Sequence, residues 1–350
     1  MTAKTNLSKP NLIAIDLFSG AGGLTCGLKQ AGFKVLAGVE LDEVAAHTYQ
    51  HNHRDSLILQ NDIRDLSPLS VMQQLNLKPG ELDLLAGCPP CQGFSSLRTK
   101  NKQLSTDDER NDLVFEFIKW VDAFRPKTLM MENVPTLAKD QRMTQFIKSV
   151  SQLGYKVTQD SLRVEDIAIY GVPQRRRRMV FLASLYEGLK TAEPVTVKTT
   201  VYDAIGGLKK AGSSGDLLHD WPEVRSPRVM EMIKLIPKNG GSRSDLPKEY
   251  WLECHKRYPK GFTDVYGRMS WDTVAPTITG GCANPSKGRY LHPYEDRAIT
   301  LREASLLQTF PLDYYFPVTF GKDKVALMIG NALPPEFIRR QAEAIKAHLN

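Results

Sequence analysis

Residues 12–23 form the sequence Leu-Ile-Ala-Ile-Asp-Leu-Phe-Ser-Gly-Ala-Gly-Gly, a short apolar run that leads into a glycine-rich turn. The run Leu12–Leu17 is typical of a buried β-strand, and Thr25–Ala31 favours a short helix that ends at Gly32. Such a turn lets the backbone approach a ligand at the carboxyl edge of a parallel sheet. It lacks the spacing of both the dinucleotide-binding and the phosphate-binding loops. Taken alone, it could also be an ordinary turn.

The alternation of strand and helix continues through the first half of the chain. It predicts an α/β fold, a mostly parallel sheet with helices on both faces. The expected strands are Val35–Glu40, Leu82–Gly87, Thr128–Val134, Tyr155–Leu162 and Met179–Ser184, and the expected helices are Leu113–Phe124, Asp140–Leu153 and Pro335–His348.

Composition limits the class of protein. A length of 350 residues suggests about two domains, and 41% hydrophobic residues exclude a mainly disordered chain. The net charge of +7 permits a polyanionic partner without proving one. No apolar run reaches about 18 residues, so no membrane association is expected. The five cysteines suit free thiols in a reducing cytosol.

The pattern changes near Tyr186. From there to about Pro317 the chain is rich in Gly, Pro and Ser, and aromatic residues alternate with Arg and Lys. We therefore expect a large domain made of residues 1–186 and 322–350, and a smaller, irregular domain of residues 187–321. The aromatic residues could equally form the core of that smaller domain.

Two acidic residues are candidates for the pocket beside the glycine-rich turn. Glu40 ends the second strand, where a carboxylate can accept hydrogen bonds from both hydroxyls of a ribose. Asp62 could bind the edge of a purine in the same pocket. These features fit a cofactor that carries a nucleoside but no pyrophosphate.

Cys88 and Cys91 lie in Gly-Cys-Pro-Pro-Cys-Gln, at the end of another strand. Their spacing matches the redox pair of a thiol oxidoreductase. A zinc site would need two more ligands at matching spacing, so no metal is expected. In a third interpretation Cys91 is a lone nucleophile, because a thiolate is suited to add to an electron-poor ring carbon.

Glu132 and a run of arginines extend this edge. Glu132 ends the strand 128–134, where a carboxyl group can hold and protonate a ring nitrogen. The run Arg175–Arg178 would by itself suggest a solvated face or a phosphate site. In a strand, however, Arg176 and Arg178 share one face, opposite Arg175 and Arg177, and that face could turn into the pocket.

Together these residues resemble the DNA (cytosine-5)-methyltransferase family. The resemblance covers nearly the whole chain in the family's order. It rests on 16–23 (Asp-Leu-Phe-Ser-Gly-Ala-Gly-Gly), Glu40, 61–63 (Asn-Asp-Ile), 89–92 (Pro-Pro-Cys-Gln), 132–134 (Glu-Asn-Val), 174–178 (Gln followed by four Arg), Arg302-Glu303 and 330–332 (Gly-Asn-Ala).

The resemblance implies the fold of the S-adenosylmethionine-dependent methyltransferases, which is Rossmann-like, with a smaller target-recognition domain. It also implies roles for four residues. The Cys91 thiolate would add to carbon 6 of a flipped cytosine, and Glu132 would hold its N3 and exocyclic amine. Arg178 would bind the carbonyl O2, with Arg176 in support. Carbon 5 then takes the methyl group of S-adenosyl-L-methionine, giving S-adenosyl-L-homocysteine and 5-methylcytosine.

The resemblance also implies binding residues. Phe18 and Gly20 would contact the methionine part of the cofactor, Glu40 the ribose, and Asp62 and Ile63 the adenine. The remaining cofactor contacts would come from Gly22, Gly23, Leu24, Leu41, Pro90, Leu113, Asn331 and Ala332, although Leu113 could be an ordinary core leucine. Contacts with double-stranded DNA would come from Gln92, Ser95, Arg98, Thr277 and Ile278. For Cys88, the backbone is expected to matter more than the sulfur.

Three alternatives stay open. A transfer-RNA methyltransferase would share the chemistry, but the Cys-Phe-Thr expected of such relatives appears here only as Gly261-Phe262-Thr263. A non-enzymatic DNA-binding relative would be expected to lack Cys91, Glu132 or Arg178. The thiol oxidoreductase is the third.

The compact length suggests a monomeric bacterial or phage enzyme of a restriction–modification system. We expect it in the cytosol with the nucleoid, protecting DNA from a cognate restriction endonuclease.

Overall fold

Seven strands form one sheet in the computed structural model, which describes residues 12–90, 112–257, 261 and 263–350. The order across the sheet is β3-β2-β1-β4-β5-β7-β6. The strands are β1 (Ile13–Leu17), β2 (Lys34–Glu40), β3 (Leu57–Gln60), β4 (Leu84–Gly87), β5 (Thr128–Asn133), β6 (Leu162–Asp166) and β7 (Arg177–Ser184).

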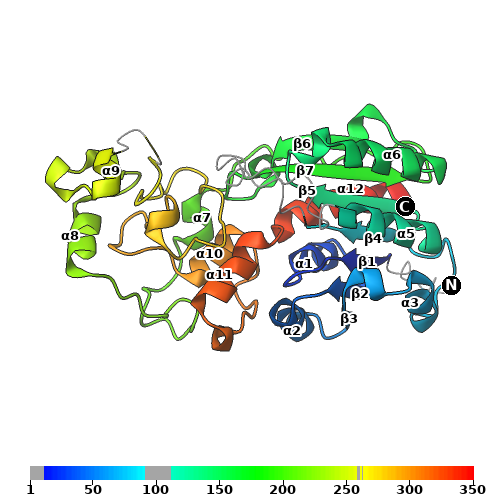
Figure 1. Cartoon of the computed structure of the whole chain (residues 1–350), viewed down its shortest axis with the longest axis horizontal. Helices are drawn as coiled ribbons and strands as arrows, with labels where there is room; N and C mark the ends of the chain where they lie inside the picture. Colours follow the sequence, from blue (N-terminus) through cyan, green and yellow to red (C-terminus); the bar gives the residue numbers. More distant parts are fainter. Residues whose placement is uncertain (1–11, 91–111, 258–260, 262) are drawn as a thin grey trace, which may run out of the picture.

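The helices divide between the sheet and a second lobe (Figure 1). Around the sheet lie α1 (Gly23–Gln30), α2 (Glu43–Asn52), α3 (Pro68–Gln74), α5 (Leu113–Phe124), α6 (Gln141–Gln152) and α12 (Pro335–Leu349). The second lobe holds α7 (Val201–Ile205), α8 (Pro227–Leu235), α9 (Glu253–Arg257), α10 (Leu301–Leu307) and α11 (Lys322–Asn331). Within the described ranges, no helix is long and apolar enough to cross a bilayer.

The expected mostly parallel sheet is confirmed. Strands β1 to β5 pair in parallel, whereas β7 runs antiparallel to both β5 and β6. One expected strand, Tyr155–Leu162, is wrong. Thr158 caps a 3₁₀ turn over Gln159–Ser161, and this turn delays the start of β6 to Leu162. The structure also contains β3, α2 and α3, which the sequence patterns did not predict.

Alternate residues of the central strands point to opposite faces of the sheet, as a period of two requires. On one face, Ile15, Leu85 and Leu129 pack with aromatic residues of α5 and α6. On the other face, the neighbouring strand residues pack against α1 and α12. The sheet is therefore buried on both sides, which explains the nearly continuous apolar runs of its strands.

The second lobe has its own apolar core and is braced by buried arginines. Residues of α7, α10 and α11 form that core, and Ala21 and Cys26 at the start of α1 join it. The Arg268 side chain is fully buried and donates hydrogen bonds to the carbonyls of Ile233, Ile236 and His292. These bonds occupy backbone acceptors that irregular structure would otherwise leave without partners.

The two lobes meet along residues 275–280. Ala275 N donates to Pro173 O at 2.9 Å, and Arg175 N donates to Ala275 O at 2.8 Å. Gly330, near the end of α11, packs so closely on this segment that a Cβ there would lie 2.1 Å from the carbonyl carbon of Thr279. A side chain at position 330 would thus push α11 away from the segment.

We predict that Gly330→Ala lowers the free energy of unfolding by about 1–3 kcal/mol, the usual cost of overpacking. The matched control is Gly207→Ala, because no heavy atom lies within 4 Å of a Cβ at Gly207. The control should change stability by less than about 0.5 kcal/mol. Denaturant unfolding of both variants checks this, and equal stability of Gly330→Ala and the control would contradict the close packing.

Candidate active site

The carboxyl ends of β1, β2, β4 and β5 meet at one edge of the sheet, where parallel α/β proteins bind their ligands. Strands β4 and β5 are in register with Gly87 opposite Met131. Cys88 follows Gly87 at the end of β4, and Glu132 follows Met131 on β5. The register therefore places these two residues side by side.

The Glu132 carboxyl is the centre of this edge and is only 2% exposed. Arg178 Nε lies 2.7 Å from its Oε1, and the Cys88 thiol donates to its Oε2 at 3.0 Å. Burial raises the pKa of Glu132, although the neighbouring Arg178 charge opposes that effect. A carboxyl group with a raised pKa can donate a proton near neutral pH.

The arginine run alternates as predicted. Arg175 and Arg177 are exposed, Arg178 is partly buried and Arg176 is 4% exposed. Arg176 Nη1 donates to Ile278 O at 2.8 Å and to Gly330 O at 3.0 Å. Burial, and then repulsion from Arg178, lower the pKa of Arg176 to about 9. Arg176 therefore stabilises the contact between the two lobes, whereas Arg178 is the cation that contacts Glu132.

The segment before Cys91 is held by the residue after Glu132. Asn133 Nδ2 donates to Pro89 O at 2.9 Å, and Asn133 Oδ1 accepts a hydrogen bond from Val134 N at 2.8 Å. Asn133 thus ties the Pro89-Pro90 segment to the end of β5. Cys91 follows directly in the chain. The predicted site residues Cys91, Gln92, Ser95 and Arg98 lie outside the described residues.

The glycine-rich loop and Glu40 come together as predicted. Gly20 N donates to Glu40 Oε2 at 2.8 Å, and Asp42 N donates to Oε1 at 2.8 Å. Burial raises the pKa of Glu40. Phe18 has a left-handed backbone with φ 62°, and no heavy atom of the described residues lies within 4 Å of a Cβ built at Gly20. The loop therefore borders open space beside a carboxylate, which fits the ribose of a nucleoside cofactor.

The next residues of this loop pack against protein. A Cβ at Gly22 would lie 2.4 Å from the His53 ring, and one at Gly23 would lie 2.5 Å from Leu333 O. Leu24 is buried in the core under α12. Glycine at 22 and 23 is therefore required for packing. The Cβ of Ala332 lies 3.5 Å from a Cβ built at Gly23. The expected contact between the glycine-rich loop and Ala332 is therefore present.

The expected adenine residues surround the same edge. Ile63 and Leu113 both belong to the apolar cluster on the α5 face, together with Phe18. Asp62 is bonded to Arg64 Nε at 3.0 Å, and this bond lowers the pKa of Asp62. Leu41 is 63% exposed beside Glu40 and offers an apolar surface to a flat ring.

The two expected DNA contacts in the second lobe differ. The Thr277 hydroxyl donates to Arg175 O at 2.7 Å and is partly exposed. The Ile278 side chain is 0% exposed, inside the core of that lobe. A contact between that side chain and DNA would require the core to open.

The sequence placed Asp16 and Asn133 in family motifs without a role of their own, and for Cys88 the backbone was expected to matter more than the sulfur. Asp16 is fully buried below the glycine-rich loop, where its Oδ2 accepts hydrogen bonds from Thr25 N at 3.1 Å and Thr25 Oγ1 at 2.7 Å. Burial raises the pKa of Asp16 to about 7. The position of Asn133 next to Glu132 was the only available sign of its role.

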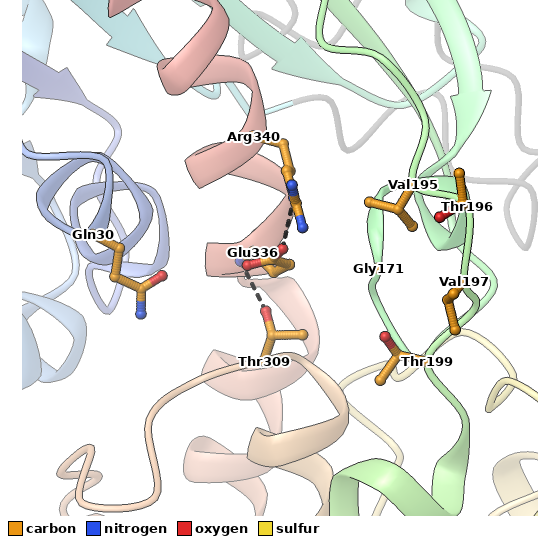
Figure 2. A pocket seen from close by; sticks show the side chains of 9 residues that line it. All are labelled: Gln30, Gly171, Val195, Thr196, Val197, Thr199, Thr309, Glu336 and Arg340. Carbon is orange, nitrogen blue, oxygen red and sulfur yellow. Dashed lines mark hydrogen bonds and ion pairs between the residues drawn. The ribbon is translucent and has the colours of Figure 1, made fainter.

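A cavity of about 480 Å³ lies away from this edge. Figure 2 shows it between α12, which carries Glu336 and Arg340, and the segment 195–199, with Thr309 nearby. Its lining contains none of the predicted site residues.

Comparison with known proteins agrees with this geometry. The family model for C-5 cytosine-specific DNA methylases matches residues 12–347. The chain is 38% identical to the Type II methylase M.HgiDII of Herpetosiphon aurantiacus, over 96% of this chain and 95% of that protein. It is 36% identical to the Type II methyltransferase M1.HphI of Haemophilus parahaemolyticus, over 96% of this chain and 87% of that protein.

A solved structure from E. coli, described as a prophage-encoded DNA modification methyltransferase, superposes with a TM-score of 0.71. It is 27% identical and covers 97% of this chain and 100% of its own. The sheet order and the edge site define an S-adenosylmethionine-dependent methyltransferase. Within that class, the chain belongs to the C-5 cytosine-specific DNA methylase family, and its activity is DNA cytosine-5 methylation.

The pKa of Asp16 generates a prediction about stability. Because its folded pKa of about 7 exceeds the ordinary 3.8, its contribution is present at low pH and is lost as pH rises through the folded value. From about pH 5 to about pH 8, the wild-type free energy of unfolding should fall by about 2 kcal/mol relative to Asp16→Asn. Denaturant unfolding at both pH values tests this, with exposed Asp122→Asn as control. A constant difference between wild type and Asp16→Asn would show that Asp16 is ionised in both states.

Proposed function

We propose that Cys91, Glu132 and Arg178 carry out the methylation of a cytosine flipped out of double-stranded DNA. The Cys91 thiolate forms a bond to carbon 6, and Glu132 donates a proton to N3. Carbon 5 then carries the electron pair that takes the methyl group. The proton on carbon 5 then leaves to solvent, the Cys91 thiolate departs from carbon 6, and N3 returns its proton to Glu132, which restores the aromatic ring and the acid. Arg178 holds O2 of the base.

The observation that supports these roles is the buried Glu132 carboxyl, next to a cation and to the segment that leads into Cys91. A desolvated carboxyl with a raised pKa is suited to protonate a ring nitrogen. Asn133 holds the backbone of Pro89, two residues before the nucleophile. The acid lies on β5, and the described segment that leads toward the nucleophile follows the adjacent strand β4, which favours a fixed geometry.

The proposed cofactor residues fit S-adenosylmethionine, which supplies an electrophilic methyl group when bound. Glu40, held by Gly20 N and Asp42 N, accepts hydrogen bonds from the ribose hydroxyls. Leu41, Asp62 and Ile63 hold the adenine. The other proposed contacts are Phe18, Gly22, Gly23, Leu24, Pro90, Leu113, Asn331 and Ala332.

The second lobe supplies target recognition in this proposal. We assign residues 187–321 to recognition and residues 1–186 with 322–350 to catalysis, with α11 at the start of the last range packed into the core of the second lobe. Gln92, Ser95, Arg98 and Thr277 contact DNA. We further propose that the enzyme acts as a monomer in the bacterial cytosol. By likeness to the Type II relatives, we propose that it protects DNA from an endonuclease with the same target.

The test of the function uses labelled S-adenosylmethionine and unmethylated genomic DNA, followed by sequencing for 5-methylcytosine. We expect methylation confined to one short motif. Labelling of transfer RNA instead of DNA would move the substrate to RNA. No transfer to either substrate would contradict the proposed enzyme.

The nucleophile is tested with duplex DNA that carries 5-fluorocytosine at the target. Fluorine on carbon 5 leaves no proton to remove after methyl transfer, so the bond between Cys91 and carbon 6 persists. We predict a protein–DNA complex that survives denaturing electrophoresis with wild type and with exposed Cys254→Ser, but none with Cys91→Ser. Glu132→Gln should lower turnover by about 10²-fold or more. A complex formed by Cys91→Ser would refute the assignment of Cys91.

The cofactor site is tested at Glu40. We predict that Glu40→Gln raises KM for S-adenosylmethionine about tenfold or more, equivalent to about 1.4 kcal/mol of lost binding, with a smaller change in kcat. The control is Glu43→Gln, an exposed residue at the start of α2. Steady-state kinetics of DNA methylation give KM and kcat for both variants. An unchanged KM in Glu40→Gln would remove Glu40 from the ribose site.

A further inference from the structure

Cys88 contacts the acid of the proposed mechanism, although the sequence suggested that its backbone matters more than its sulfur. Its thiol donates to Glu132 Oε2 at 3.0 Å, while Arg178 Nε lies 2.7 Å from Oε1. The two donors come from opposite neighbours of β5, because Cys88 follows β4 and Arg178 lies on β7. Glu132 is therefore held from both sides, by a hydrogen bond to Oε2 and by an ion pair at Oε1.

A carboxyl group held in this way cannot rotate freely about its last bond. A carboxylate has about four acceptor positions, two on each oxygen. The Cys88 thiol takes one position on Oε2 and the Arg178 cation lies beside Oε1, so acceptor positions remain on both oxygens. The remaining positions lie in the plane of the carboxyl group, the arrangement needed for the adjacent N3 and exocyclic amine of cytosine.

We propose that Cys88 is a positioning residue of the methyltransferase, whose thiol fixes the plane of the Glu132 carboxyl so that both oxygens face the cytosine edge. The proposal rests on the role of Glu132 given above. Cys88 itself forms no bond to the substrate and undergoes no redox change.

The choice of a thiol has a chemical reason. The groups that face Glu132 are Arg178 from β7, Arg176 from the preceding segment and Cys88 from the end of β4. Both arginines favour the ionised carboxylate, which cannot donate a proton. A thiol is a weaker hydrogen-bond donor than a hydroxyl. It therefore orients the carboxyl group while stabilising the ionised form less than a hydroxyl in the same place would.

The experiment compares Cys88→Ser and Cys88→Ala with wild type in single-turnover methyl transfer to target DNA across pH. Under the proposal, the alkaline fall in rate reports ionisation of Glu132. Serine, a stronger donor, should move that fall to lower pH and keep the maximal rate within about threefold. Alanine should move the fall to higher pH and lower the maximal rate about three- to tenfold, because the carboxyl group is no longer oriented. Exposed Cys254→Ala should match wild type in both respects.

Two results would overturn the proposal. One is a Cys88→Ala enzyme whose rate and pH profile match wild type. The other is an equal loss in the serine and alanine variants with an unchanged pH profile and a lowered melting temperature, which would mean that position 88 only packs. Full activity of Glu132→Gln would instead refute the role of Glu132, so the two failures are distinguishable.

Discussion

The burial of one charge-bearing group, the Glu132 carboxyl, constrains the rest of the active site. A carboxylate removed from water must be met by a cation or by hydrogen-bond donors. The antiparallel direction of β7 meets this need, since the start of β7 lies beside the end of β5. A parallel strand in that place would bring its first residues to the opposite edge. The one reversal of direction next to β5 thus delivers Arg178 to the carboxyl group.

The same segment links catalysis to the second lobe. Arg176 lies two residues before Arg178 and binds the carbonyls of Ile278 and Gly330. Backbone bonds between 173–175 and Ala275 run alongside. The strand that supplies the active-site cation therefore also carries the contact with the proposed recognition lobe. A shift of that lobe would act on the site through only a few covalent bonds.

Much of the sheet could be predicted because its strands are buried on both faces and so appear as apolar runs. The clustering of Glu40 with the glycine-rich loop followed from the rule that parallel strands end at one edge. The late start of β6 was not predictable from apolar content, because a capped turn at Thr158 determines it. The Cys88 contact depends on the register of β4 and β5, which no local pattern specifies. The burial of Ile278 was missed because a motif gives residue types but no exposure.

The backbone of Phe18 has a consequence for cofactor binding. A left-handed conformation in a residue other than glycine costs about 1–3 kcal/mol and persists only where its surroundings enforce it. Here the two residues after Phe18 are fixed, because Ser19 N donates to Val39 O and Gly20 N donates to the Glu40 carboxylate. The glycine-rich loop therefore takes its shape from the protein's own hydrogen bonds when the chain folds. Association then requires little ordering of this loop, so little of the binding free energy is lost in arranging it.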